Sequence, residues 1–214
     1  HLKHLPLFTR HFDFTSFLFR VLWAIFLKFA FRYYIRLKVK GDLAQVYKEH
    51  PRLLLISNHA SHLDAVSIAA AIPFRYWLDL YLTAAKDYWF SNSIFTFFSK
   101  HCLGAIPIDR KDKKGEAVKL CITLLQKLDR IWMILFPEGT RSKDGYIHTF
   151  KRGVSLFALQ TKTPILFIYI EGNNDLWPKG HLIPHPGKLT IHVGPVQPPA
   201  EIAEIDNNYR NWVM

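Results

Sequence analysis

The chain has 214 residues, half of them hydrophobic and 15% aromatic, with 28 Lys and Arg against 17 Asp and Glu. This length and apolar content fit one domain with a full core and exclude a disordered tail. The net charge of +11 suits nucleic acid, anionic lipid headgroups or a phosphorylated substrate. Nucleic acid is disfavoured because the sequence lacks zinc-finger spacing, an RNA-binding aromatic signature and a basic-region heptad. The cysteines, Cys102 and Cys121, form no CxxC motif, which favours reduced thiols in a cytosol-facing protein.

The N-terminal segment, residues 1–35, differs from the rest of the chain. From residue 12 it is rich in Phe, Leu and Trp, and its longest uncharged run between Arg20 and Lys28 is Val21 to Leu27. That run is far below the ~18–20 apolar residues of a spanning helix. On a helical wheel the basic residues fall within one half of the circumference: Arg10, Arg20, Lys28, Arg32 and Arg36. A basic stripe on an apolar, aromatic helix predicts an element lying in a membrane interface. The alternative is a core helix with a solvated edge.

From about residue 36 to residue 214 apolar runs alternate with helix-length segments. Seven runs read as strands: Ile35–Val39, Leu53–Ser57, Asp79–Thr83, Ala105–Ile108, Ile131–Phe136, Ile165–Ile170 and Leu189–Val193. Helices are expected at about 62–71, 87–100, 114–128 and 152–161, and Asn173 to Pro186 reads as a loop. This alternation predicts an α/β domain, a mostly parallel sheet flanked by helices.

The first strand-end cluster is Asn58-His59-Ala60-Ser61-His62-Leu63-Asp64, which follows the apolar run Leu53 to Ile56. A carboxylate five residues after a histidine can pair with it. In such a pair the carboxylate fixes the imidazole tautomer, and the other ring nitrogen can take a proton.

Two further clusters follow predicted strands, at the sheet edge where α/β proteins bind ligands. One is Gly104 to Arg110. The other is Phe136-Pro137-Glu138-Gly139-Thr140-Arg141-Ser142. In the latter, glycine lets the backbone approach a ligand closely, and Arg141 offers a bidentate fork for phosphate. Arg110 would supply a second cation.

These blocks resemble those of the 1-acylglycerol-3-phosphate acyltransferases. Asn58-His59 with Asp64 is similar to the first block of that family, Gly104 to Arg110 to the second and Phe136 to Ser142 to the third. Thr163-Pro164-Ile165, leading into a strand, resembles the fourth. The four blocks keep the family order, and the resemblance covers about residues 36–198.

The resemblance implies that His59 is a general base, oriented by Asp64, which activates a lipid hydroxyl without an acyl-enzyme. The acceptor would be 1-acylglycerol 3-phosphate and the product phosphatidic acid; other lysophospholipids or glycerol phosphate are alternative acceptors. The donor would be acyl-CoA or acyl carrier protein, and no metal or bound cofactor is expected. The protein would lie at the cytoplasmic face of an anionic membrane, without a nucleic-acid partner. The implied phosphate-site residues are Arg110, Glu138, Gly139, Thr140, Arg141 and Lys151.

Three other interpretations stay open at this point. His59, His62 and Asp64 could form a metal site, although Ala65 stands where a familiar His/Asp cluster has its last histidine. Ser61 or Cys102 could be an acylated nucleophile. A non-catalytic membrane-binding protein would explain the N-terminal segment but leave the His59–Asp64 pair without a role.

Overall fold

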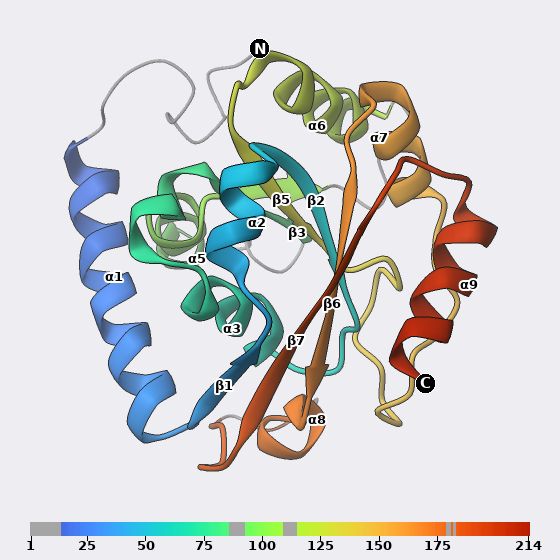
Figure 1. Ribbon diagram of the computed structural model, residues 1–214. Coiled ribbons are helices and arrows are strands. Elements are labelled where there is room, and N and C mark those ends of the chain that lie inside the picture. The colour runs from blue at the N-terminus through green and yellow to red at the C-terminus, as the bar shows by residue number, and fades with distance from the viewer. Residues whose placement is uncertain (1–13, 86–92, 109–114, 179–180, 182) are drawn as a thin grey trace.

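The computed structural model describes residues 14–85, 93–108, 115–178, 181 and 183–214. Within these residues seven strands form one sheet in the order β1-β7-β6-β2-β5-β3-β4 (Figure 1). The strands are β1 (Leu37–Lys40), β2 (Arg52–Ser57), β3 (Leu80–Ala85), β4 (Ala105–Ile108), β5 (Ile131–Leu135), β6 (Ile165–Glu171) and β7 (Leu189–Gln197). The seven predicted strands are therefore all present.

The sheet is mostly parallel, as predicted. Strands β6, β2, β5, β3 and β4 run in the same direction. Strand β7 is antiparallel to β6 and carries β1 parallel to itself, so these two strands run against the rest. The reversal follows from the connection between β6 and β7, which holds only the short helix α8 (Asn173–Leu176) and no crossover helix.

Helices cover both faces of the sheet because its central strands are apolar on both sides. In β2, Leu53 and Leu55 pack into one core cluster and Leu54 and Ile56 into the other. The first cluster also takes in side chains from α1 (Phe14–Tyr33), α2 (Leu43–Glu49) and α3 (Leu63–Ala71). The second is covered by α6 (Glu116–Lys127), α7 (Gly153–Thr161) and α9 (Ile202–Val213).

Four helical elements were not predicted. They are α2, the 3₁₀ helix η3 (Phe74–Asp79), α8 and α9. The prediction of a loop from Asn173 to Pro186 is wrong for its first turn, which forms α8. Within the predicted helix 87–100, the described residues form α5 (Ser93–Phe98). The π-helical turn η4 (Ser99–Leu103) follows it directly.

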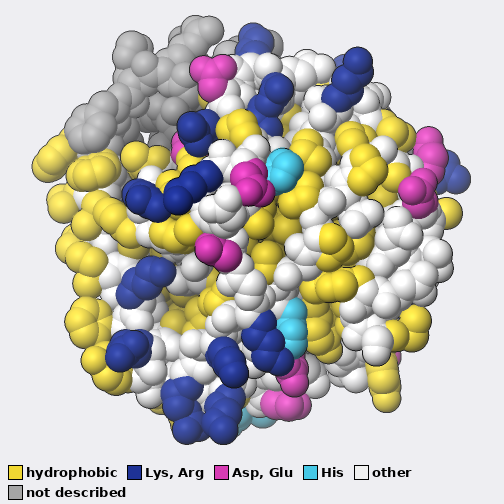
Figure 2. Space-filling view, viewed as in Figure 1, with side chains coloured by type: hydrophobic (Ala, Val, Ile, Leu, Met, Phe, Trp, Pro, Cys, Tyr) yellow, Lys and Arg dark blue, Asp and Glu magenta, His cyan; other side chains and the backbone are white. Residues whose placement is uncertain are grey.

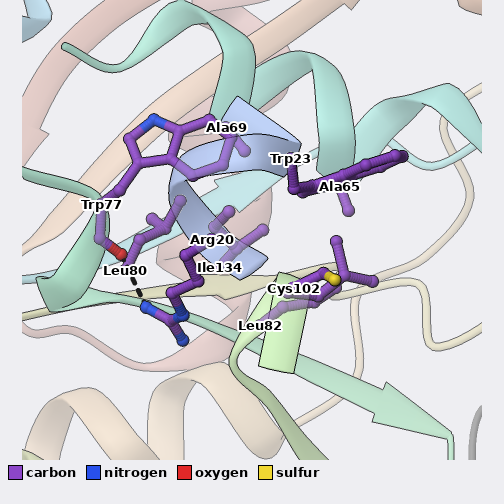
Figure 3. Close-up of a pocket in the computed structure, with 10 residues that line it drawn as sticks. Arg20, Trp23, Ala65, Ala69, Trp77, Leu80, Leu82, Cys102 and Ile134 are labelled. Carbon is purple, nitrogen blue, oxygen red and sulfur yellow. Dashed lines mark hydrogen bonds between the residues drawn. The ribbon is translucent and has the colours of Figure 1, made fainter. Parts of the chain in front are cut away.

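Helix α1 lies along one side of the domain (Figure 1), but part of its basic stripe faces the protein. Arg20 is 2% exposed and donates from Nη1 to the carbonyl of Trp77 at 2.8 Å. Its guanidinium lies beside a cavity of about 20 Å³ that α1 forms with α3, β3 and η4 (Figure 3). That volume holds about one water molecule. Burial lowers the pKa of Arg20 to about 10.

The ammonium of Lys28 also turns toward the domain, where it donates to the carbonyls of Ala70 and Ile72 at 2.5 and 3.1 Å. These carbonyls lie at the C-terminal end of α3, which leaves acceptors without helical donors. Arg20 and Lys28, two members of the predicted basic stripe, are therefore bonded to the domain itself. Among the residues described, no helix is both long and apolar enough to cross a membrane.

We expect Lys28→Met to lower the free energy of unfolding by about 1 kcal/mol, because the carbonyls of Ala70 and Ile72 lose a charged donor. For a domain of this size this corresponds to a fall in Tm of about 2–4 °C. The matched control is Arg32→Met, since Arg32 is exposed on the same helix. Thermal unfolding followed by circular dichroism measures both, and an equal loss in the two variants would contradict the inward placement of Lys28.

Candidate active site

The candidate site lies at the carboxyl ends of the parallel strands β2, β5 and β6, where an open α/β sheet places its ligands. Asn58 joins two of these ends. Its side-chain amide donates to the carbonyl of Ile170 at 3.0 Å, and its side-chain oxygen accepts from the Ile170 N–H at 2.9 Å. The Tyr209 hydroxyl accepts from the Asn58 N–H and donates to the carbonyl of Ile168. The backbone just before His59 is thus held by bonds to both β6 and α9.

His59 and Asp64 form a close pair. Nδ1 of His59 lies 2.8 Å from Oδ2 of Asp64, whose side chain is fully buried, while the His59 side chain keeps 21% exposure. The same carboxylate oxygen accepts the N–H groups of Ala60 and Ser61 at 2.8 and 2.9 Å. The imidazole stacks on Phe136, with 4.0 Å between ring centroids. The arrangement orients the ring and leaves Nε2 as the nitrogen that can exchange a proton with a ligand.

Asn173 completes the surroundings of Asp64. Its side-chain amide donates to Oδ1 of Asp64 at 2.8 Å, and the residue is 4% exposed. A buried carboxylate is costly unless its oxygens are hydrogen-bonded, and here each oxygen has at least one donor. Asn173 is therefore a positioning residue for the His59–Asp64 pair.

Glu138, from the third block, supports His59 from the backbone side. Its Oε1 accepts the His59 N–H at 2.8 Å and its Oε2 accepts the His148 N–H at 3.1 Å. Burial raises the pKa of Glu138, while these two donors act in the opposite direction. The His59 carbonyl in turn accepts the Ser142 N–H at 2.7 Å. Both backbone groups of His59 are therefore bonded to the segment 138–142.

Gly139 and Lys151 lie against each other. Gly139 has φ +70°, and a Cβ added there would stand 2.7 Å from Nζ of Lys151. A side chain at position 139 would therefore clash with the lysine as well as strain the backbone. The close approach that the sequence suggested for a ligand is made, in the structure, by the Lys151 side chain.

Arg141 is half-buried and Thr140 exposed on the same loop. Within the described part of the chain, Nη1 of Arg141 is buried without a hydrogen-bond partner. Burial, followed by the charges of Arg141 and His59, lowers the pKa of His62 to about 4. His62 is thus neutral near pH 7. Arg110 lies outside the described residues.

The alternative interpretations gain little from this geometry. The Ser61 hydroxyl is buried, donates to the Trp177 carbonyl at 2.8 Å and accepts the Leu63 N–H at 3.1 Å. Burial raises the pKa of the Cys102 thiol to about 11, which disfavours the nucleophilic thiolate. Among the described residues no group of three or more His, Cys, Asp or Glu could hold a metal ion.

Sequence reasoning missed three positioning groups: Asn173, Tyr209 and the ring of Phe136. Asn173 could have been found, because it follows the carboxyl end of a predicted strand, as the three recognised clusters do. The contact of Tyr209 could not, since it comes from a C-terminal helix that has no such relation to a strand end.

A comparison with protein-family models matches residues 36–171 to the Acyltransferase family. Two similar proteins are the 1-acyl-sn-glycerol-3-phosphate acyltransferase alpha of Mus musculus and the 1-acyl-sn-glycerol-3-phosphate acyltransferase of Limnanthes douglasii. The first is 29% identical over 82% of this chain and 60% of its own, and the second 30% identical over 74% and 53%. The chain thus spans little more than half the length of these curated relatives.

The fold is also found in a solved structure. The 1-acyl-sn-glycerophosphate (LPA) acyltransferase PlsC of Thermotoga maritima superposes with a TM-score of 0.72 at 23% identity. The match covers 92% of this chain and 82% of that one. With the family model matched over residues 36–171, the chain belongs to the Acyltransferase family.

Proposed function

We propose that this protein transfers a fatty acyl group from an acyl thioester to the free hydroxyl of 1-acylglycerol 3-phosphate and releases phosphatidic acid. The observation that carries the proposal is the His59–Asp64 pair, joined at 2.8 Å beside the loop that bears Arg141. The similar proteins of Mus musculus and Limnanthes douglasii are named for the same reaction class. The order of the four sequence blocks supports it as well.

In the proposed reaction, Nε2 of His59 takes the proton of the acceptor hydroxyl as its oxygen attacks the thioester carbonyl. Asp64 keeps the proton on Nδ1 and stabilises the imidazolium that forms. The tetrahedral intermediate collapses by breaking the carbon–sulfur bond, and the thiolate takes the proton back from the imidazolium. An ester replaces a thioester and a thiol is released, with no acyl-enzyme.

Arg141 and Lys151 are the proposed ligands of the acceptor phosphate, with the exposed hydroxyl of Thr140 as a further donor and Arg110 as an additional cation. The unsatisfied Nη1 of Arg141 supports this assignment, because a buried N–H group requires an acceptor. Glu138 takes a different role from the one its place in the block suggested. Its carboxylate already accepts two backbone N–H groups and would repel a phosphate, so it positions the backbone of His59.

The acyl donor is an acyl-CoA or an acyl-acyl carrier protein. Both are acidic, so the net charge of +11 suits either one. The reaction as written uses only the thioester, the hydroxyl and the groups named above. It requires no metal ion and no bound cofactor.

The test is acyl transfer by purified protein in detergent or vesicles, with labelled acyl-CoA and acyl-acyl carrier protein and a panel of lysolipids. We expect His59→Ala to lower kcat by about 10²–10⁴, the usual contribution of a general base. Arg141→Gln should raise KM for 1-acylglycerol 3-phosphate and leave monoacylglycerol, which lacks the phosphate, unaffected. Activity should survive a strong chelator.

His62→Gln is the matched control, because His62 lies three residues from His59 and takes no part in the proposed reaction. Full activity of His59→Ala would refute His59 as the general base. The absence of acyl transfer by the unmodified protein with every donor and acceptor would leave it as a membrane-binding module without catalysis. Equal reaction of acceptors with and without phosphate, unchanged in Arg141→Gln, would refute the phosphate site while leaving acyl transfer intact.

Asn173→Ala should lower kcat about tenfold with little change in KM, because Oδ1 of Asp64 loses its side-chain donor. An unsatisfied buried acceptor costs about 1–3 kcal/mol, and about 1.4 kcal/mol in the transition state corresponds to a factor of ten. Steady-state kinetics in parallel with Asn174→Ala separates this effect from general damage to α8. A rise in KM with kcat unchanged would show that Asn173 binds substrate instead.

We further propose that α1 places the protein on a membrane. Six large apolar side chains of α1 are between 41% and 68% exposed: Leu18, Leu22, Ile25, Phe26, Phe29 and Tyr33. They fall within an arc of about 100° on the helix. Such a continuous apolar face on a soluble surface is typical of an interaction site.

Basic residues continue from this face around the end of α1. Arg32, Arg36, Lys38 and Lys40 are exposed, and Figure 2 shows Lys and Arg side chains gathered below the hydrophobic edge that α1 forms. An apolar helix face with adjacent cations matches a bilayer with anionic lipids. Acceptor lipid could then reach His59 from the bilayer.

Phe26→Gln with Phe29→Gln should reduce binding to anionic phospholipid vesicles at least tenfold, since both rings leave the proposed apolar face. Co-sedimentation with vesicles measures the partition coefficient. The control pair is Leu156→Gln with Leu159→Gln, which removes two exposed apolar side chains from α7 on the opposite face of the sheet. Equal binding of both variants would exclude α1 as the membrane contact.

A further inference from the structure

A pocket lined by basic and tyrosine side chains lies at the edge of the sheet opposite the candidate active site. It has a volume of about 390 Å³ and is lined by Tyr47, Lys48, Arg75, Tyr76 and Arg130. These residues come from the end of α2, from η3 and from the turn before β5. Arg52 at the start of β2 is in register with Ile131 at the start of β5, so the pocket sits at the amino ends of the strands.

The pocket is separated from His59 by the length of β2. That strand runs from Arg52 to Ser57, and at about 3.3 Å per residue it puts roughly 20 Å between the two edges. A group held here is therefore outside hydrogen-bond reach of His59. None of the lining residues takes part in the proposed acyl transfer.

Stacked rings hold the pocket's arginines in place. The rings of Tyr47 and Tyr76 stack with centroids 3.6 Å apart and an interplanar angle of 18°. Arg75 lies over Tyr76 at 4.6 Å from the ring centroid, and Arg130 lies over Tyr47 at 5.4 Å. A guanidinium held over a ring keeps its N–H edge for a second partner. Each arginine thus lies against one ring of the tyrosine pair, and Arg130 is also hydrogen-bonded to the side chain of Tyr47.

The base of this stack is rigid. Tyr47 is 4% exposed, and its ring also contacts Trp132, with the centroids 5.2 Å apart. Its hydroxyl donates to Asp79, and burial together with this bond raises the pKa of Tyr47 to about 12. Tyr47 is thus neutral at physiological pH. The carboxylate of Asp79 is engaged at the base of the stack.

The charged side chains that line the pocket are all basic. In the described parts of the chain, no carboxylate lies within ion-pair distance of Lys48, Arg75 or Arg130. The neighbouring Glu49 accepts a hydrogen bond from Gln45. Figure 2 shows Lys and Arg side chains near the upper end of α2, with acidic and hydrophobic side chains among them. Among the described residues no ion pair neutralises these three cations, while Arg130 and Asp79 both interact with the side chain of Tyr47.

We propose that this pocket binds a phosphate-bearing ligand at a site distinct from the acyl-transfer site. Each arginine can take two oxygens of one phosphate through its fork, and Lys48 adds a point charge. The volume falls within the range of small-molecule sites, about 300–1,000 Å³. The phosphate can belong to a free soluble molecule or to a lipid headgroup.

The test is titration with inorganic pyrophosphate, followed by isothermal calorimetry. It is made on Arg141→Gln protein so that the proposed acceptor site does not contribute. We expect one site whose affinity falls at least tenfold in Arg75→Gln with Arg130→Gln. The control pair, Lys119→Gln with Lys127→Gln, removes the same charge from exposed positions of α6 on the other face of the sheet, and it should change the affinity less than twofold.

A second variant separates a built site from general attraction between charges. Tyr76→Leu keeps all the cations but removes the ring beneath Arg75, and we expect it to weaken pyrophosphate at least threefold. Its fold is checked by circular dichroism. Unchanged affinity in Tyr76→Leu, or equal loss in the two charge-removal pairs, would overturn the proposal.

Vesicles identify the source of the phosphate. Binding to phosphatidic acid in phosphatidylcholine vesicles is compared between the Arg75→Gln/Arg130→Gln protein and the α6 control. A selective loss on vesicles, with no binding of soluble pyrophosphate, assigns the pocket to a lipid headgroup. Pyrophosphate binding with equal vesicle binding assigns it to a soluble ligand. No dependence on Arg75 and Arg130 in either arm refutes the site.

Discussion

The buried carboxylate of Asp64 is the constraint on which the site depends. Four donors surround it: Nδ1 of His59, the N–H groups of Ala60 and Ser61, and the side-chain amide of Asn173. A charge without solvent exposure needs such a set, because desolvation otherwise favours its protonation. The donors come from the turn after β2 and from the start of α8, after β6. The ends of two adjacent strands must therefore be held together before the histidine is oriented.

The third sequence block belongs to the same structural unit as the first. The His59 N–H is bonded to Glu138, and the His59 carbonyl to the Ser142 N–H. The ring stacks on Phe136, at the end of β5. The block therefore holds the histidine through several of its residues, while Nη1 of Arg141 has no hydrogen-bond partner within the described part of the chain. The loop can combine a carboxylate with residues suited to an anion because the carboxylate of Glu138 faces the backbone N–H groups of His59 and His148.

The strands and their order along the chain could be predicted because the apolar runs are buried on both faces and are bounded by turn residues. The placement of polar residues at strand ends could also be predicted, because the polar clusters follow directly after these apolar runs. The inward direction of Arg20 could not, since a helical wheel separates faces without saying which one packs on the sheet. The hydroxyl of Tyr209 illustrates a second limit. It reaches Asn58 across 151 positions of sequence, and only the packing of α9 on the sheet brings the two together.

The two faces of α1 together determine what surroundings the helix requires. Burial lowers the pKa of Arg20, which means that the charged guanidinium is less well solvated there than in water. Solvation alone would therefore turn this side of the helix outward. The outward face presents Leu22, Phe26 and Phe29 at 53%, 56% and 62% exposure, which water disfavours. Turning the helix would bury these side chains and free the arginine, but Arg20 would lose its bond to Trp77 and Lys28 its bonds to the end of α3. A bilayer would remove the conflict, because it would cover the apolar face while the inward bonds stayed intact. The orientation of α1 is therefore the one expected of a helix whose outward apolar face lies against a membrane.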